Sequence, residues 1–137
     1  MLNARRLLAM TVVLFGIGIM LLDQADAIEL TGAWSTDANL CGLVFTKKGK
    51  QVEFAELSDL YGSGLIINGD RIRGKAARCT IKSRKQDGDV LDMSAACAST
   101  IMTGNLRFSL RVIDDNNFSR MFPNIEGMEI KYTRCTL

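Results

Sequence analysis

Hydrophobic and polar residues alternate along most of the chain after residue 28, which predicts β-strands because successive side chains of a strand point to opposite faces. The clearest case is the segment 77–97, where two alternating runs flank the turn residues Asp87-Gly88-Asp89. Their apolar positions predict the buried faces of a hairpin: Ala77, Cys79 and Ile81 on the first run, and Leu91, Met93, Ala95 and Cys97 on the return.

The hairpin predicts a disulfide. A three-residue loop at 87–89 sets Cys79 opposite Cys97, with Ile81 facing Ala95, Ser83 facing Met93 and Lys85 facing Leu91. Opposed Cβ atoms lie about 4.5 to 5.5 Å apart, slightly beyond the usual disulfide separation. Because the two cysteines are directly opposed on the same face of the hairpin, Cys79–Cys97 is the first choice of disulfide. The remaining pair is then Cys41–Cys135. The alternative of Cys41–Cys79 with Cys97–Cys135 has equal spacings, but nothing else in those segments aligns.

Further strands and turns follow the same pattern. The Asn68-Gly69 pair is a strong hairpin signal, Lys48-Gly49 predicts another turn, and Thr36-Asp37 can cap a short helical turn. Residues 53–61 are the other helical candidate. The expected strands lie in 29–35, 42–55, 64–77, 105–122 and 128–135. We therefore expect an all-β fold, a small antiparallel up-and-down barrel or sandwich of about eight strands with one short helical turn and two disulfides.

The N-terminus has the plan of a signal peptide. Arg5 and Arg6 precede an apolar run over 7–22, and a polar segment ends in the small-x-small pattern of residues 25–27. The run is shorter than the roughly 18 residues of a membrane span. We predict a signal peptide over 1–27 and a single domain over 28–137, periplasmic or secreted, with a retained anchor as the alternative.

The cysteines agree with export. All four lie after residue 27, and an even number in a small exported domain favours two disulfides, because that environment is oxidising. The alternative is a zinc site, but the chain has no histidine and no CxxC pair, so all four scattered thiolates would be needed. We predict no metal and no cofactor.

The charge distribution favours an anionic envelope surface over nucleic acid as a binding partner. The net charge is +2, near balance, yet the segment 70–85 is rich in Arg and Lys. Strand alternation puts Arg78, Lys82 and Arg84 on the outer face of the hairpin, where they are candidates for contact with an anionic envelope surface. A solvated face that discourages edge pairing is the alternative interpretation.

Few residues suit catalysis. Without histidine, the side chain best suited to proton transfer near neutral pH is missing. Ser63 in "YGSGL" lacks the spacing of a nucleophile elbow. Several paired carboxylates fall at predicted turns, where Asp satisfies backbone donors. We predict that the protein is not an enzyme and has no catalytic residues.

The Gly32-Ala33-Trp34 segment in the first expected strand resembles the Gly-x-Trp signature of the calycins, the lipocalin-like barrels. The resemblance implies that Trp34 lies at the closed end of a barrel and that Arg134 of the last strand packs across it. The chain is also similar in plan to small exported β-domains of Gram-negative bacteria, some of which inhibit proteases or lysozyme.

Two non-enzymatic functions follow. The first is a binding module for an unidentified protein, an inhibitor or envelope-stress factor, with Tyr61, Phe122, Ile125 and Met128 as candidate contact residues, since aromatic and Met anchors carry binding energy. The second is a carrier of a small apolar ligand. Its expected lining residues are Phe45, Phe54, Ile66, Met93, Phe108 and Tyr132.

Overall fold

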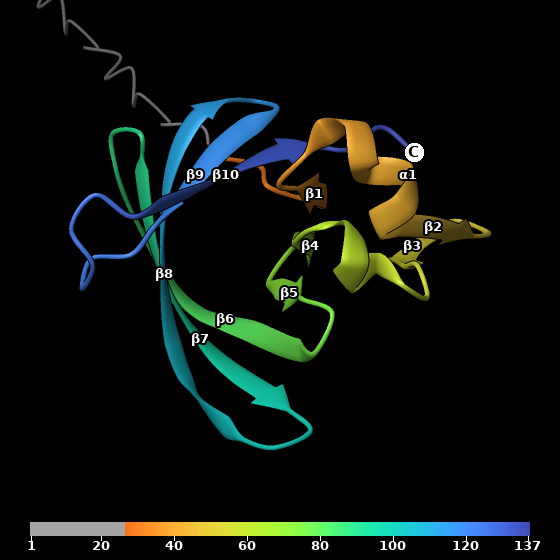
Figure 1. Cartoon of the computed structure of the whole chain (residues 1–137). Helices are drawn as coiled ribbons and strands as arrows, with labels where there is room; N and C mark the ends of the chain where they lie inside the picture. The colour runs from red at the N-terminus through yellow and green to blue at the C-terminus, as the bar shows by residue number, and fades with distance from the viewer. Residues whose placement is uncertain (1–26) are drawn as a thin grey trace, which may run out of the picture.

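The computed structural model describes residues 27–137, and within them the chain forms a closed antiparallel barrel (Figure 1). Around the barrel the strand order is β1-β10-β9-β8-β7-β6-β5-β4, and β1 closes it by pairing with β4. The strands are β1 Gly32–Ser35, β4 Gly64–Asn68, β5 Arg71–Arg73, β6 Ala77–Asp87, β7 Val90–Ser99, β8 Thr103–Asp114, β9 Asn117–Met121 and β10 Glu129–Arg134. The expected all-β class is confirmed, and the architecture is a barrel rather than a sandwich.

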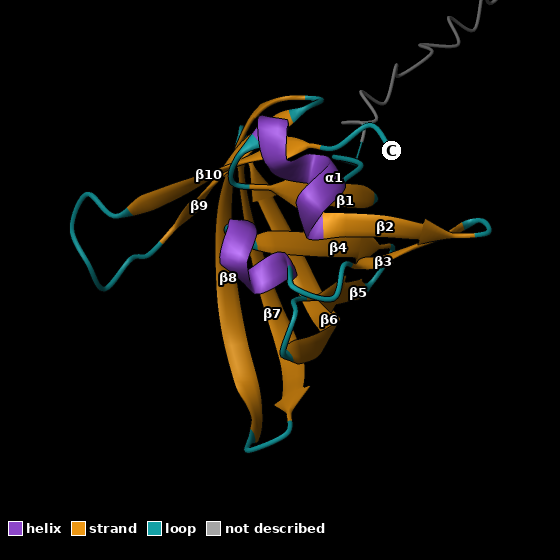
Figure 2. Cartoon of the chain, turned by 45° about the vertical axis from the view of Figure 1, so that its right-hand side comes forward, coloured by secondary structure: helices purple, strands orange, loops and turns teal. Residues whose placement is uncertain are grey.

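The chain leaves the barrel between β1 and β4, over residues 36–63. This insertion holds the 3-10 helix η1 (Ala38–Leu40), α1 (Cys41–Val44), the two-stranded sheet of β2 (Phe45–Lys48) and β3 (Gln51–Phe54), and the 3-10 helix η2 (Ser58–Tyr61). Figure 2 shows these elements on one side of the barrel. The predicted cap is confirmed, because the Asp37 side chain accepts a hydrogen bond from Asn39 N at 2.9 Å. Of the helical candidate 53–61, only η2 is helical.

Two apolar clusters correspond to the two faces of the barrel wall. The cluster inside the barrel includes Trp34, Met93, Phe108, Phe118 and Tyr132. The second cluster lies outside the wall, where the insertion packs Val44 and Phe45 against Ala33 of β1 and Ile66 of β4. Strand alternation explains both, since Ala33 and Trp34 point to opposite faces of β1.

The β6–β7 hairpin departs from its predicted register along half of its length. Cys79 faces Cys97 and Ile81 faces Ala95 as expected, but a bulge follows, so Arg84 rather than Ser83 faces Met93 and Gln86 rather than Lys85 faces Leu91. The extra residue is Lys82. A bulge leaves one residue unpaired and moves every later side chain to the other face. The turn beyond it is correspondingly tighter, with Asp87 paired to Val90.

Both predicted disulfides are present. Cys79 bonds Cys97 across the hairpin, and Cys41 of α1 bonds Cys135 just after β10, over a sequence separation of 94. The second bridge ties the insertion to the last strand of the barrel. These bonds indicate a non-cytoplasmic environment, because thiols are kept reduced in the cytosol.

The predicted signal peptide lies almost wholly outside the described residues. Across 27–137, no helix has the length and apolar character needed to cross a membrane.

Candidate functional site

One end of the barrel is closed by Trp34 and Arg134. The indole is 1% exposed and donates from Nε1 to Leu30 O at 2.8 Å. The Arg134 guanidinium lies 4.2 Å from the indole centroid and donates to three backbone carbonyls, those of Asp115 at 3.0 Å, Glu29 at 3.2 Å and Thr31. This is the contact that the calycin resemblance implies. The arginine links the N-terminal segment, the β8–β9 turn and the last strand.

Gly32 leaves room for this guanidinium. Its φ of +146° lies in a region that other residues rarely adopt, and a Cβ there would lie 2.8 Å from Arg134 Nη1. The glycine of the Gly-x-Trp segment therefore has a structural role.

The opposite end of the barrel carries exposed apolar loops. In this antiparallel topology the turns β4–β5, β6–β7 and β8–β9 lie at the closed end, so the other connections and η2 lie at the open end. Figure 2 shows the β9–β10 loop extending from the strands. We define the open-end loops as η2 with Leu57, the β7–β8 loop and the β9–β10 loop. Their exposed large apolar residues are Leu57, Leu60, Tyr61, Ile101, Met102, Ile125 and Met128.

Three of the four predicted contact residues are among them. Tyr61 is 37% exposed, Ile125 53% and Met128 40%. Phe122 differs, because it is partly buried and the Arg120 guanidinium lies 4.8 Å from its ring centroid.

Arg120 lies between two phenylalanine rings at the open end. Its guanidinium lies 4.7 Å from the Phe108 centroid as well as over Phe122. It also lines a pocket of about 250 Å³ with Ser58 and Tyr132. Ser58 is 1% exposed, and its Oγ has no hydrogen-bond partner within 27–137. The sequence analysis did not single out Arg120, because it lies within the short strand β9 and belongs to no motif.

The predicted basic stripe is wrong at Arg84. Because of the bulge, Arg84 pairs with Met93 and so shares the face of that buried residue, whereas Arg78 keeps its outward direction. The Arg84 guanidinium is also engaged, since Nη2 donates to Gly69 O at 2.5 Å and pairs with Asp70 at 3.2 Å. Lys82 is exposed at the bulge. The three side chains therefore do not form one surface.

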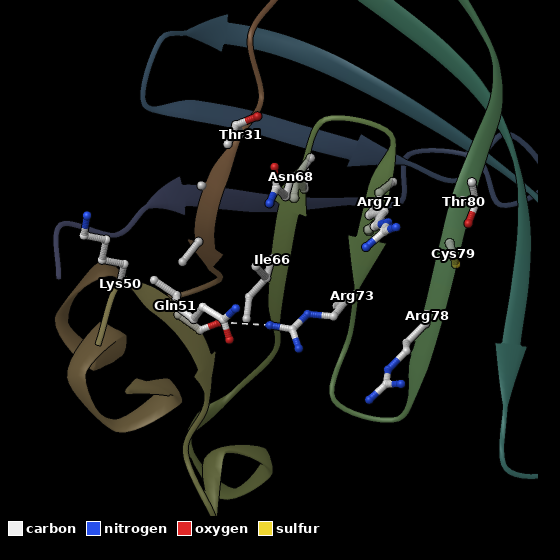
Figure 3. Close-up of a pocket in the computed structure, with 15 residues that line it drawn as sticks. Thr31, Lys50, Gln51, Ile66, Asn68, Arg71, Arg73, Arg78, Cys79 and Thr80 are labelled. Atoms are coloured by element: carbon white, nitrogen blue, oxygen red, sulfur yellow. Dashed lines mark hydrogen bonds between the residues drawn. The ribbon is translucent and has the colours of Figure 1, made fainter. Parts of the chain in front are cut away.

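A different set of cations surrounds a groove of about 810 Å³ on the outer wall, between the β2–β3 hairpin and strands β1, β4, β5 and β6 (Figure 3). Lys50 lies on the hairpin side, and Arg71, Arg73 and Arg78 lie on the barrel side. Of these, only Arg78 belonged to the predicted stripe. Alternation about the buried Ile72 is the signal that places Arg71 and Arg73 on the outer face together. The position of the β2–β3 hairpin beside these strands is a tertiary contact that the sequence pattern did not predict.

Three carboxylates have structural roles. Asp114 accepts hydrogen bonds from Asn116 N at 2.8 Å and Asn117 Nδ2 at 2.9 Å, and these bonds hold the pKa of Asp114 below its usual range. Hydrogen bonds from the Thr31 side chain and backbone N–H similarly lower the pKa of Glu29. Glu129 forms an ion pair with Arg111 at 2.7 Å.

The six residues expected to line the cavity of a carrier do not lie together. Met93, Phe108 and Tyr132 lie inside the barrel. The other three predicted residues, Phe45, Phe54 and Ile66, belong to the outer cluster under the insertion. The sequence could not distinguish the two clusters because β2 and β3 were expected to be barrel strands.

Comparison with known proteins gave no assignment: no family model, no curated protein and no solved structure matches the chain. The closed barrel of eight strands is consistent with a calycin-like fold.

Proposed function

We propose that this protein is an exported, non-enzymatic binding module, periplasmic or secreted, that binds a partner protein through the open-end loops. An inhibitor of an envelope hydrolase or an envelope-stress factor would use this arrangement. The observation that supports this proposal is that three separate loops at one end of a disulfide-bonded barrel each expose large apolar residues.

The chemistry of these residues supports a protein partner. Single exposed apolar residues are ordinary on a surface, but here each of three loops at the same end of the barrel exposes at least one of them. A partner protein that spans these loops would bury them as anchors. The barrel holds the ends of these loops in place, so less conformational entropy is lost on binding than with a flexible segment.

Co-purification from the native envelope tests this proposal. The exported protein is compared with an open-end variant, Leu60→Ser/Ile125→Ser, and with Ile113→Ser as the matched control. Ile113 is 55% exposed and lies on β8 near the closed end. Removing two anchors should weaken binding about tenfold or more. We expect one protein, quantified by mass spectrometry, to be captured by the wild type and the control and lost by the open-end variant.

Equal capture by all three forms would contradict the proposed interface, as would the absence of any specific partner. The carrier alternative predicts another result, an apolar small molecule retained in native mass spectrometry of the same preparation.

A further inference from the structure

The groove on the outer wall brings arginines together in an unfavourable arrangement. Arg73 of β5 and Arg78 of β6 are direct cross-strand partners, and Arg71 lies two residues from Arg73 on the same face. Like charges opposite one another destabilise a sheet. None of the groove's lining residues is acidic, so nothing in the lining offsets this repulsion.

The three arginines differ in what they already bind. Arg73 Nη2 donates to Val52 O at 2.8 Å and so holds the β2–β3 hairpin against the barrel (Figure 3). The side chains of Arg71 and Arg78 are exposed and have no hydrogen bond or ion pair with any residue of 27–137. Elsewhere in the same range, Arg84 and Arg111 each have a carboxylate partner. Two guanidinium groups are thus left for an external acceptor.

The groove has the form of a ligand site. Its volume is about 810 Å³, and it is bounded by the hairpin on one side and the arginine-bearing strands on the other. The half-buried Val52 contributes apolar surface beside the cations, and the largely buried Ala33 and Ile66 lie at the base of the lining. Guanidinium groups present planar forks that match phosphate oxygens, and charge-assisted hydrogen bonds of this type are strong.

We propose that this groove binds a phosphate group, held by Arg71 and Arg78. The bound anion offsets the repulsion between Arg73 and Arg78, and the apolar surface accepts the part of the ligand next to the phosphate. The phosphate belongs to a free phosphorylated molecule or to a lipid headgroup. This site is separate from the open-end loops and does not depend on the proposed function.

Calorimetric titration with inorganic pyrophosphate tests the site, and sedimentation with vesicles of phosphatidylcholine and phosphatidylglycerol distinguishes the source. The protein is purified after export and compared with the variant Arg71→Gln/Arg78→Gln. Arg73 is left unchanged because it holds the hairpin. The matched control is Arg107→Gln/Lys131→Gln, which removes the same charge from exposed positions on β8 and β10, outside the groove.

We expect the Kd for pyrophosphate to rise about tenfold or more in the groove variant and to change less than about twofold in the control. Binding to the vesicles alone, with the same dependence on the variants, would assign the phosphate to a lipid headgroup. The proposal is overturned if neither probe binds the wild type, or if the control weakens binding as much as the groove variant does. Thermal unfolding of each variant checks that the fold is retained.

Discussion

The closing contact between Trp34 and Arg134 leads to a measurable prediction. Replacing Arg134 with Met keeps an aliphatic side chain over the indole but removes the cation and its three hydrogen bonds to backbone carbonyls. The cation–π contact contributes about 0.5 to 1 kcal/mol, and each hydrogen bond contributes about 1 kcal/mol net. We therefore expect Arg134→Met to lower the free energy of unfolding by about 4 kcal/mol.

Urea unfolding with the disulfides intact measures this change, followed by circular dichroism and by the fluorescence of Trp34, the only tryptophan. A domain of this size loses about 4 °C in Tm per kcal/mol, so the expected drop in thermal unfolding is about 16 °C. The free energy of unfolding of Arg134→Lys should lie between those of the wild type and Arg134→Met. A single ammonium group cannot donate to all three carbonyls that the guanidinium group reaches.

Arg111→Met is the matched control. Arg111 forms a single exposed ion pair with Glu129 at 2.7 Å, and such pairs contribute about 0 to 1 kcal/mol. If Arg134→Met costs no more than Arg111→Met, the reasoning that Arg134 joins three segments of the closed end is refuted.

Three further predictions concern stability. Replacing Cys41 and Cys135 with Ser should cost about 4 kcal/mol in urea unfolding, because the bridge closes a long loop; a loss below about 1 kcal/mol would contradict this. Gly64→Ala should cost about 1 to 3 kcal/mol, since its Cβ would lie 2.7 Å from Phe45 Cζ, and an unchanged Tm would show that the insertion can shift. The lowered pKa of Asp114 stabilises the fold above about pH 4 and this contribution is lost as the pH falls through the folded-state pKa. In Asp114→Asn the Tm should therefore decrease less as the pH falls below about 4 than it does in the wild type. An unchanged dependence of Tm on pH would contradict this role of Asp114.

Local patterns were sufficient for much of the fold. Alternation around Cys79 and Cys97 predicted the hairpin and its bridge, and the remaining cysteine pair followed by elimination. The Asp37 cap was also predicted correctly. The hairpin expected at Asn68-Gly69 is present, although Asn68 pairs with Arg71 and the turn itself is Gly69-Asp70. Cap and turn preferences depend on hydrogen bonds between near neighbours.

The candidate sites were less predictable. Arg84 was placed on the wrong face because a bulge has no reliable signature in an alternating run, and one extra residue reverses all later side chains. Phe45 and Ile66 were expected inside the barrel, since a strand pattern shows that a face is buried but not which cluster buries it.

The sequence by itself determined the all-β class, the two disulfides and the residue types available for function, because these depend on alternation, turn chemistry and composition. Only the tertiary structure decided that β2 and β3 leave the barrel, that the apolar loops share one end, and that Lys50, Arg71 and Arg78 line the same groove. The physical reason is that a closed barrel brings together segments far apart in the sequence, and local pattern carries no information on which segments meet.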